Sequence, residues 1–171
     1  MAEALDTTQR RRLSQAEVDL ICARHDRLFA ARPGGARAVF SWMDLTGLSL
    51  KGRNLADADF SAACLVGCDL SGAKLADAKM FGITVRDADL SGADLSRSMP
   101  IGDFKGANMR GATLVDLRGG ADIRNQSMGL MRASFRSARL QGAEVVATQR
   151  RRPAQHEVVA AAGAGVAAID H

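Results

Sequence analysis

The residues of this sequence most able to do chemistry are aspartates that recur through its middle third. Closely spaced carboxylates can share general acid and general base roles, or they can bind a cation. These aspartates, however, recur at fixed steps beside apolar residues, at positions typical of exposed turns. We therefore interpret them as turn residues and not as a catalytic set. They are Asp57, Asp59, Asp69, Asp77, Asp87, Asp89 and Asp94.

Histidine, the usual partner of a nucleophile or a metal, does not occur between residues 38 and 147. His25 lies upstream, where we interpret it as a partly buried packing residue, and His156 and His171 lie near the C-terminus. Carboxylates without a nearby histidine favour neither a zinc site nor a His-activated nucleophile. The glycine pair at 119–120 lacks the lysine and the spacing of a phosphate-binding loop. We expect no enzyme activity, no metal and no cofactor.

The three cysteines, Cys22, Cys64 and Cys68, are odd in number and form no C-x-x-C pair. This usage is typical of reduced, small apolar side chains, so we expect a cytoplasmic protein. The first twelve residues hold no apolar stretch typical of a secretory signal. The longest apolar run, Val158 to Ile169, is too short and too rich in Ala and Gly to predict a membrane span.

A large apolar residue occupies every fifth position from Phe40 to Leu95 without interruption. A period of five fits neither an α-helix, at about 3.6 residues per turn, nor a flat strand, at about 2. We predict one short strand and one turn per pentad, with four pentads closing a square coil. Successive coils would stack about 4.8 Å apart as a parallel β-helix, an all-β solenoid.

In this prediction each fifth residue points inward, together with a small residue two positions before it. The residue two positions after each centre is often Gly or Asp, types that tolerate the positive φ of a tight turn. Residues twenty apart would form columns along the solenoid. The predicted core residues are Phe40, Leu45, Leu50, Leu55, Phe60, Leu65, Leu70, Leu75, Met80, Val85, Leu90, Leu95, Phe104, Met109, Leu114, Leu130, Phe135, Leu140 and Val145.

The repeated motif A-(D/N)-L-x-x resembles that of the pentapeptide-repeat family. The resemblance covers about residues 38–147, and it implies a right-handed quadrilateral parallel β-helix. The motif appears as Ala58-Asp59-Phe60, Ala88-Asp89-Leu90, Ala93-Asp94-Leu95, Ala107-Asn108-Met109 and Ala112-Thr113-Leu114.

The pattern slips once over residues 97–102. The next clear centre after Leu95 is Phe104, nine residues on, and Pro100 falls where a centre is expected. Proline cannot donate a ladder hydrogen bond. We predict an irregular side that has lost one residue.

A second slip covers residues 115–129, after which the pattern resumes at Leu130. Because Leu95 and Leu130 lie thirty-five residues apart, a whole number of pentads, we predict one continuous β-helix with a local bulge anchored by Ile123 and Met128. Such an excursion is either a tolerated insertion or a functional graft.

Different structure is expected at the two ends. Residues 1–13 are predicted to be a flexible basic arm, and residues 14–37 a capping helix followed by a Pro/Gly turn. A helix over about 14–31 is indicated by a capping box that begins at Ser14. Residues 148–171 form a basic, Ala-rich tail, which would be either a weak helix or disordered.

Charge is polarised along the predicted solenoid, although the whole chain carries only +4. Residues 55–104 hold eight acids and four bases, a net of −4, whereas residues 105–152 hold three acids and ten bases, a net of +7. This distribution indicates either drift at solvated positions or a basic end that docks an acidic partner. The candidate partner-binding residues are Arg132, Arg136, Arg139, Arg150, Arg151 and Arg152.

Three functions remain open at this point. A rigid solenoid without catalytic residues favours a non-enzymatic binding or scaffold module for an unidentified protein partner. The resemblance implies an alternative, because quinolone-resistance members of the family bind type II topoisomerases by mimicking DNA. Thirteen bases against twelve acids in residues 38–147 argue against such mimicry. Weak nucleic-acid binding through Arg10–Arg12 and Arg150–Arg152 is the third function, and it is not favoured.

A homodimer through the C-terminal coil is also open, because the apolar residues Phe135, Leu140 and Val145 of that coil need cover. Alternatively, the apolar residues Val158 and Ile169 of the tail fold back over it.

Overall fold

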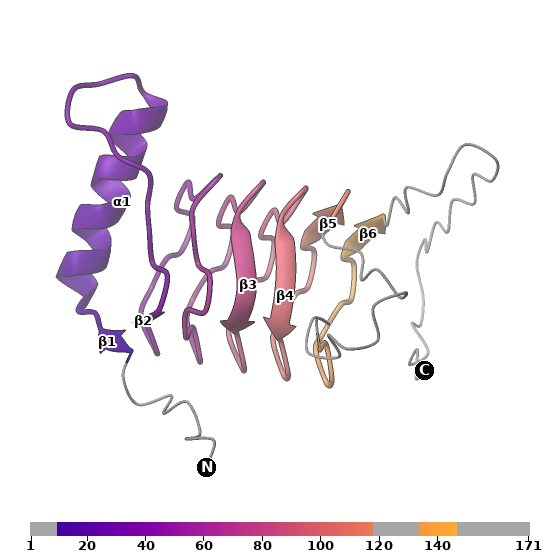
Figure 1. Cartoon of the computed structure of the whole chain (residues 1–171). Helices are drawn as coiled ribbons and strands as arrows, with labels where there is room; N and C mark the ends of the chain where they lie inside the picture. Colours follow the sequence, from indigo (N-terminus) through magenta and orange to yellow (C-terminus); the bar gives the residue numbers. More distant parts are fainter. Residues whose placement is uncertain (1–9, 118–133, 147–171) are drawn as a thin grey trace, which may run out of the picture.

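The computed structural model describes residues 10–117 and 134–146, and the structural statements below concern these residues. Figure 1 shows a row of stacked coils with a single helix at its N-terminal end. The elements are β1 (Arg11–Arg12), α1 (Gln15–Phe29), β2 (Met43–Asp44), β3 (Lys79–Thr84), β4 (Met99–Asp103), β5 (Thr113–Val115) and β6 (Glu144–Val146).

The repeat region is a β-helix solenoid whose sides pair in parallel, coil upon coil. Asp59 bridges Lys79, and Asp69 bridges Asp89, so that residues twenty apart lie side by side. Between coils, the Leu55 N–H donates to the Lys74 carbonyl at 2.8 Å. Most sides are too short to form a β-strand, and each of these sides pairs with the neighbouring coil through isolated parallel β-bridges. The predicted period of twenty residues per coil is confirmed.

Each side ends in a tight turn of the predicted kind. The Ala58 N–H donates to the Leu55 carbonyl at 3.1 Å, and Asp57, the third residue of this turn, has φ 60°. A positive φ at the third position defines a type II turn, where glycine is least strained. One corner of the solenoid carries glycine on five coils, whereas the next corner carries charged residues. The glycines are Gly52, Gly72, Gly92, Gly111 and Gly142, and the charged residues are Asp57, Asp77, Arg97 and Asp116.

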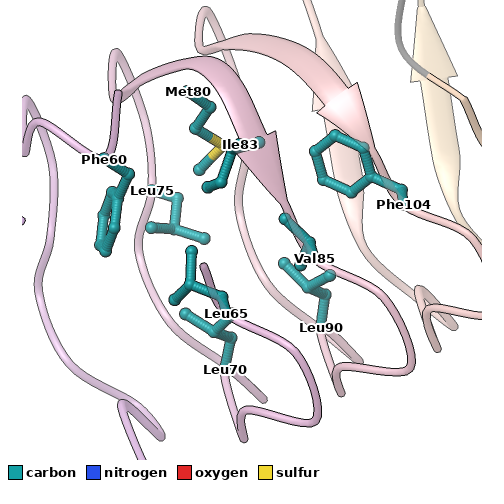
Figure 2. Close-up of a pocket in the computed structure, with 9 residues that line it drawn as sticks. All are labelled: Phe60, Leu65, Leu70, Leu75, Met80, Ile83, Val85, Leu90 and Phe104. Atoms are coloured by element: carbon teal, nitrogen blue, oxygen red, sulfur yellow. The ribbon is translucent and has the colours of Figure 1, made fainter. Parts of the chain in front are cut away.

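The interior consists of the predicted columns of apolar side chains. The rings of Phe40 and Phe60 stack with their centroids 5.0 Å apart, and Phe104 stacks on Phe135 at 5.1 Å. The centres from Phe40 to Leu114 are at most 3% exposed. Figure 2 shows the apolar lining of the interior, formed by Phe60, Leu65, Leu70, Leu75, Met80, Ile83, Val85, Leu90 and Phe104.

The last described coil departs from the predicted core. Val145, predicted to be buried, is 40% exposed, while Phe135 and Leu140 are only partly buried. These three residues belong to residues 134–146, and described residues stack on only one side of this coil. Leu130, another predicted core residue, lies outside the described residues.

One residue is missing from the solenoid at the β3–β4 pair. Lys79 pairs with Met99, twenty residues on, whereas Thr84 pairs with Asp103, nineteen residues on. The register shifts between Phe81 and Ile83. A Cβ at Gly102 would lie 2.1 Å from the Ile83 carbonyl oxygen. The shortened side therefore depends on the close approach that only glycine permits.

The coil that follows has a longer path. Asp103 bridges Ser134, thirty-one residues on, and Asn108 bridges Arg139 with the same offset. Eleven residues beyond the usual twenty thus lie between stacked positions. The predicted anchors Ile123 and Met128 fall in residues 118–133, outside the described part of the chain.

The sequence predicted a flexible arm over residues 1–13, and this prediction is wrong for residues 10–13. Arg11 and Arg12 pair in parallel with Met43 and Asp44, and Leu13 is only 4% exposed. Parallel pairing satisfies the backbone, and burial of Leu13 beside the first coil adds apolar contact area, which together order this segment. Residues 1–9 lie outside the described part of the chain.

Helix α1 begins with the predicted capping box. The Ser14 side chain accepts the Glu17 N–H, and the Glu17 carboxylate accepts the Ser14 N–H at 2.8 Å. The helix buries Val18, Cys22 and His25. Its side chains therefore contribute directly to the apolar cluster of the solenoid.

Helix α1 also supplies polar groups to the first coil. The Gln15 side-chain amide donates to the Ser49 carbonyl and accepts the Ser49 N–H, both at 2.9 Å. On the neighbouring side, Asp19 forms an ion pair with Arg53 at 2.7 Å. One side chain thus replaces the strand partner that Ser49 would have in a longer solenoid.

Truncation of one stacked ring tests the columns. We expect Phe60→Ala to lower the free energy of unfolding by about 3–5 kcal/mol, because it leaves a cavity beneath Phe40. Equilibrium unfolding in urea, followed by circular dichroism, measures this change. A loss below about 1 kcal/mol would contradict the tight packing described above.

Two glycine variants distinguish the cost of a steric clash with neighbouring backbone from the cost of a side chain at a positive φ. Gly102→Ala should cost about 3 kcal/mol or prevent folding, because its Cβ meets the Ile83 carbonyl. Gly92→Ala, where φ is +65° and no atom lies within 4 Å of the new Cβ, should cost only about 1 kcal/mol. Unfolding curves for both variants give the comparison, and equal losses would show that the shortened side tolerates a Cβ.

Candidate interaction surfaces

The repeated aspartates that directly precede a large apolar residue are hydrogen-bonded to backbone. Asp59, Asp69 and Asp89 each accept, through Oδ1, the N–H of the serine two residues on, at 2.9–3.0 Å. The side-chain and backbone hydrogen bonds from Ser71 lower the pKa of Asp69. The aspartates before each centre therefore hold the turns in shape, a role that their repeat position did not reveal.

Asp94 accepts the Ser96 N–H in the same way, whereas Asp57, Asp77 and Asp87 occupy positive-φ corners, where Asp77 pairs with a base. Arg97 forms an ion pair with Asp77 at 2.9 Å, donating from both Nε and Nη2. Hydrogen bonding to Asp77 raises the pKa of Arg97. Within the described residues, no three His, Cys, Asp or Glu side chains are grouped closely enough to hold a metal ion.

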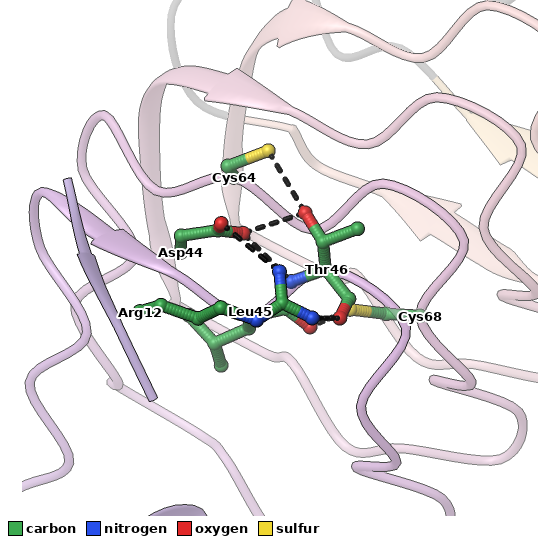
Figure 3. A network of polar contacts seen from close by, with 6 residues as sticks. All are labelled: Arg12, Asp44, Leu45, Thr46, Cys64 and Cys68. Carbon is green, nitrogen blue, oxygen red and sulfur yellow. Dashed lines mark hydrogen bonds and ion pairs between the residues drawn. The ribbon is translucent and has the colours of Figure 1, made fainter. Parts of the chain in front are cut away.

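A polar network joins β1 to the first two coils, as Figure 3 shows. The Asp44 carboxylate accepts the N–H and the hydroxyl of Thr46 at 2.9 and 2.5 Å, and it accepts Arg12 at 3.2 Å. Burial raises the pKa of Asp44, but the bonds from Thr46 and Arg12 outweigh it and the net shift is downward. The Thr46 hydroxyl also lies 3.4 Å from the Cys64 sulfur. The network anchors the N-terminal segment to the first two coils.

The three cysteines are free thiols. Burial raises the pKa of Cys22 and of Cys68 to about 11 in each case. The Cys68 thiol also donates to the Leu45 carbonyl at 2.9 Å, as Figure 3 shows. Cys22 and Cys68 are therefore protonated near neutral pH and have the character of packing groups.

Exposed bases gather on the last two described coils. Arg136 and Arg139, both predicted to bind a partner, are exposed, and so are Lys105 and Arg110. The Gly106 N–H donates to the Arg136 carbonyl at 2.9 Å, while Asn108 bridges Arg139. The structure therefore brings these four side chains to two neighbouring sides of the solenoid. We call Lys105, Arg110, Arg136 and Arg139 the basic surface.

None of the four bases of the basic surface forms an ion pair within residues 10–117 and 134–146. Arg110 donates instead to the neutral Gln141 side chain at 3.0 Å. Sequence reasoning missed Lys105 and Arg110, because the thirty-one-residue offset to the next coil hides their neighbours. The other predicted partner-binding residues, Arg132 and Arg150 to Arg152, lie outside the described residues.

The described part of the chain contains no helix long and apolar enough to cross a membrane.

Comparison with protein families identifies the repeat. The family model described as pentapeptide repeats, in eight copies, matches residues 36–72 and 54–97. A comparison with curated proteins gave no match.

Rfr23, a pentapeptide repeat protein from the cyanobacterium Cyanothece 51142, is 22% identical over 63% of this chain and 58% of that chain, with a TM-score of 0.34. A pentapeptide repeat protein from the Arabidopsis thaliana thylakoid lumen is 31% identical over 59% of this chain and 63% of that chain, with a TM-score of 0.35. A trypsin-treated form of QnrB1, a plasmid-mediated fluoroquinolone resistance protein, is 17% identical over 64% of each chain, with a TM-score of 0.45. The matches thus span 58% to 64% of these three solved chains.

The family match falls on residues 36–97, the same stretch in which the structure stacks coil upon coil with a period of twenty residues. As the sequence predicts, residues 36–97 match the family model of pentapeptide repeats.

Proposed function

We propose that this protein is a non-enzymatic binding module whose basic surface docks an acidic protein partner. The observation that carries the proposal is the cluster of Lys105, Arg110, Arg136 and Arg139, which are exposed and form no ion pair among the described residues. The charge of Lys105 helps to lower the pKa of Asp103, but the ion pair of Asp103 is with Arg86. Elsewhere on the solenoid, Arg97 forms an ion pair with Asp77, and Arg86 forms one with Asp103.

Stacking makes this surface electrostatically unfavourable in the free protein. Neighbouring coils lie about 4.8 Å apart, so Lys105 and Arg136 follow one another at close to this spacing. Two like charges about 4 Å apart repel by roughly 1 kcal/mol in water, and by more as solvent is excluded. An anionic partner would relieve this repulsion and would be steered to the surface over about a Debye length.

A protein partner is favoured over a nucleic acid by the shape and composition of the surface. Single-stranded nucleic acids are usually held by aromatic side chains that stack on bases, together with bases that contact phosphates. The exposed aromatic residues of the described chain are Phe29, Trp42 and Phe81, and none belongs to the last two described coils. A flat side of short strands also has no element that could enter a groove of duplex DNA.

We also propose a handedness and a cross-section for the solenoid, and a role for α1. We place the coils in a right-handed quadrilateral β-helix, with α1 as a cap that prevents further strands from adding to the first coil. The bonds of Gln15 to Ser49 and the burial of Val18 and Cys22 support this role. With the first coil capped, we expect a protein partner, or a second copy of the chain, to bind at the C-terminal part of the solenoid. We also propose that the protein is cytoplasmic.

Charge reversal tests the basic surface. The probe is fluorescently labelled poly-L-glutamate, whose binding to the full chain is followed by fluorescence anisotropy at several salt concentrations. The double variant Arg136→Glu, Arg139→Glu should bind at least tenfold more weakly than the unchanged protein, with an unchanged melting temperature, because the bases are exposed and unpaired. Binding of the unchanged protein should weaken steeply with salt.

The matched control is Lys51→Glu, Lys79→Glu, which makes the same change in net charge at exposed bases on other coils. This control should bind poly-L-glutamate nearly as well as the unchanged protein. An equal loss of affinity for poly-L-glutamate in both double variants would show that binding depends only on net charge, and it would overturn the proposed site. Tighter binding of a labelled DNA duplex than of poly-L-glutamate would favour a nucleic-acid partner instead and would also overturn it.

A further inference from the structure

His25 is a fully buried histidine, 0% exposed, that plays no part in the proposed binding function. Its ring packs edge-on against Phe29, with centroids 4.9 Å apart, at the C-terminal end of α1. The sequence predicted a partly buried packing residue at this position. The complete burial of an ionisable ring is a stronger constraint, because any charge placed there is cut off from water.

The ring of His25 is bonded to the first coil in only one protonation state. Its Nδ1 accepts the N–H of Ala38 at 3.0 Å. An acceptor nitrogen carries no proton, so this bond requires the neutral ring with its proton on Nε2. The Nε2 atom has no hydrogen-bond partner among the described residues. Protonation would therefore remove the bond to Ala38. The backbone carbonyl of Ala56 favours the protonated ring and so opposes the effect of burial, although it forms no full hydrogen bond with Nε2.

Ala38 lies where the chain enters the solenoid. It is fully buried and is the first of the small inward residues, directly after the loop that leaves α1. The same loop folds back on the helix, since the Ala36 N–H donates to the Arg24 carbonyl at 2.9 Å. A Cβ at Gly35 would lie 2.5 Å from the Leu28 nitrogen. The bond between His25 and Ala38 is thus one of few polar links between the end of α1 and the first coil.

Charged groups from three elements face the ring. Asp26 on α1 and Asp57 at the end of the first coil favour the protonated form, whereas Arg37 in the connecting loop opposes it. Burial is the largest influence and lowers the pKa of His25 below its ordinary value of 6.5.

We propose that His25 is an acid-sensitive latch, which holds the end of α1 and its loop against the first coil while the imidazole is neutral and releases them when it is protonated. Release would expose the backbone of Ala38 and weaken the hold of the helix on the solenoid end. The latch responds to mild acid, a range in which few other side chains titrate.

The direction in which pH changes the stability of the latch follows from the number of protons bound in each of its two states. Because the pKa of His25 is lower in the docked state than in the released state, the released state binds more protons in the interval between the two values. The latch is fully stabilising above about pH 6.5, the ordinary histidine value. The stabilisation of the docked state by His25 falls as the pH drops from about 6.5 to the lowered pKa of His25. Below that pKa the stabilisation no longer changes with pH.

Heteronuclear NMR of the full chain tests the latch directly. At pH 7.5, the ¹⁵N signals of His25 should show the Nε2-protonated tautomer. The opening constant at Ala38 is obtained from amide exchange after correction for the intrinsic pH dependence. It should rise by up to tenfold for each pH unit between about 6.5 and the lowered pKa, because one proton is taken up on release. The amide of Leu90, deep in the solenoid, should show no such rise.

Two variants accompany the measurement on the unchanged protein. His25→Gln keeps an acceptor for the Ala38 N–H but does not titrate, so its corrected opening constant should be flat over the same pH range. The double variant His156→Gln, His171→Gln replaces the two other histidines of the chain and should keep the full pH response.

The unchanged protein alone can overturn the latch, whether or not His25→Gln folds. A His25 ring that is protonated on Nδ1 at pH 7.5 contradicts the bond to Ala38. A ring that titrates while the Ala38 opening constant stays flat contradicts the release. A response that persists in His25→Gln assigns it to another group.

Discussion

The narrow interior of the solenoid is the constraint on which the other features depend. A side of five residues leaves room for one large and one small inward side chain, such as Phe60 with Ala58, both at most 1% exposed. The inward pair fixes which residue precedes the turn, and the turn then requires a positive φ two residues after the large one. Backbone hydrogen bonds between coils follow from this geometry, because each side presents its amides to the coil above and below. Core, turns and ladder are therefore three results of one spatial limit.

This limit explains why much of the fold could be predicted from the sequence. The columns through Phe40 and Leu55, and the small partners such as Ala73, follow from counting in fives, since each pentad repeats the same environment. Counting fails wherever a contact is not periodic. Leu13 lies thirty-two residues before Leu45, so no pentad register predicts its burial, and the pairing of Gln15 with Ser49 joins a helix to a coil.

The candidate interaction surface was predictable only in part, for a similar reason. Arg136 and Arg139 stand out as a local excess of bases, but Lys105 and Arg110 join them only through a coil that is eleven residues longer than the usual twenty. The aspartates lie in turns, as their spacing predicted. The spacing did not predict that Asp59 and Asp89 accept the backbone N–H of the serines two residues on.

The corner formed by glycine on five coils has a consequence for how the protein can be modified. An added Cβ would meet no atom within 4 Å at Gly52, Gly72, Gly92 and Gly111, so the space outside this edge is open. The obstacle to a side chain here is the handedness of L-amino acids and not crowding, so a residue of the mirror-image configuration would fit without distortion. The edge thus forms a straight line of attachment points, one per coil, along which chemical synthesis could display labels at molecular spacing.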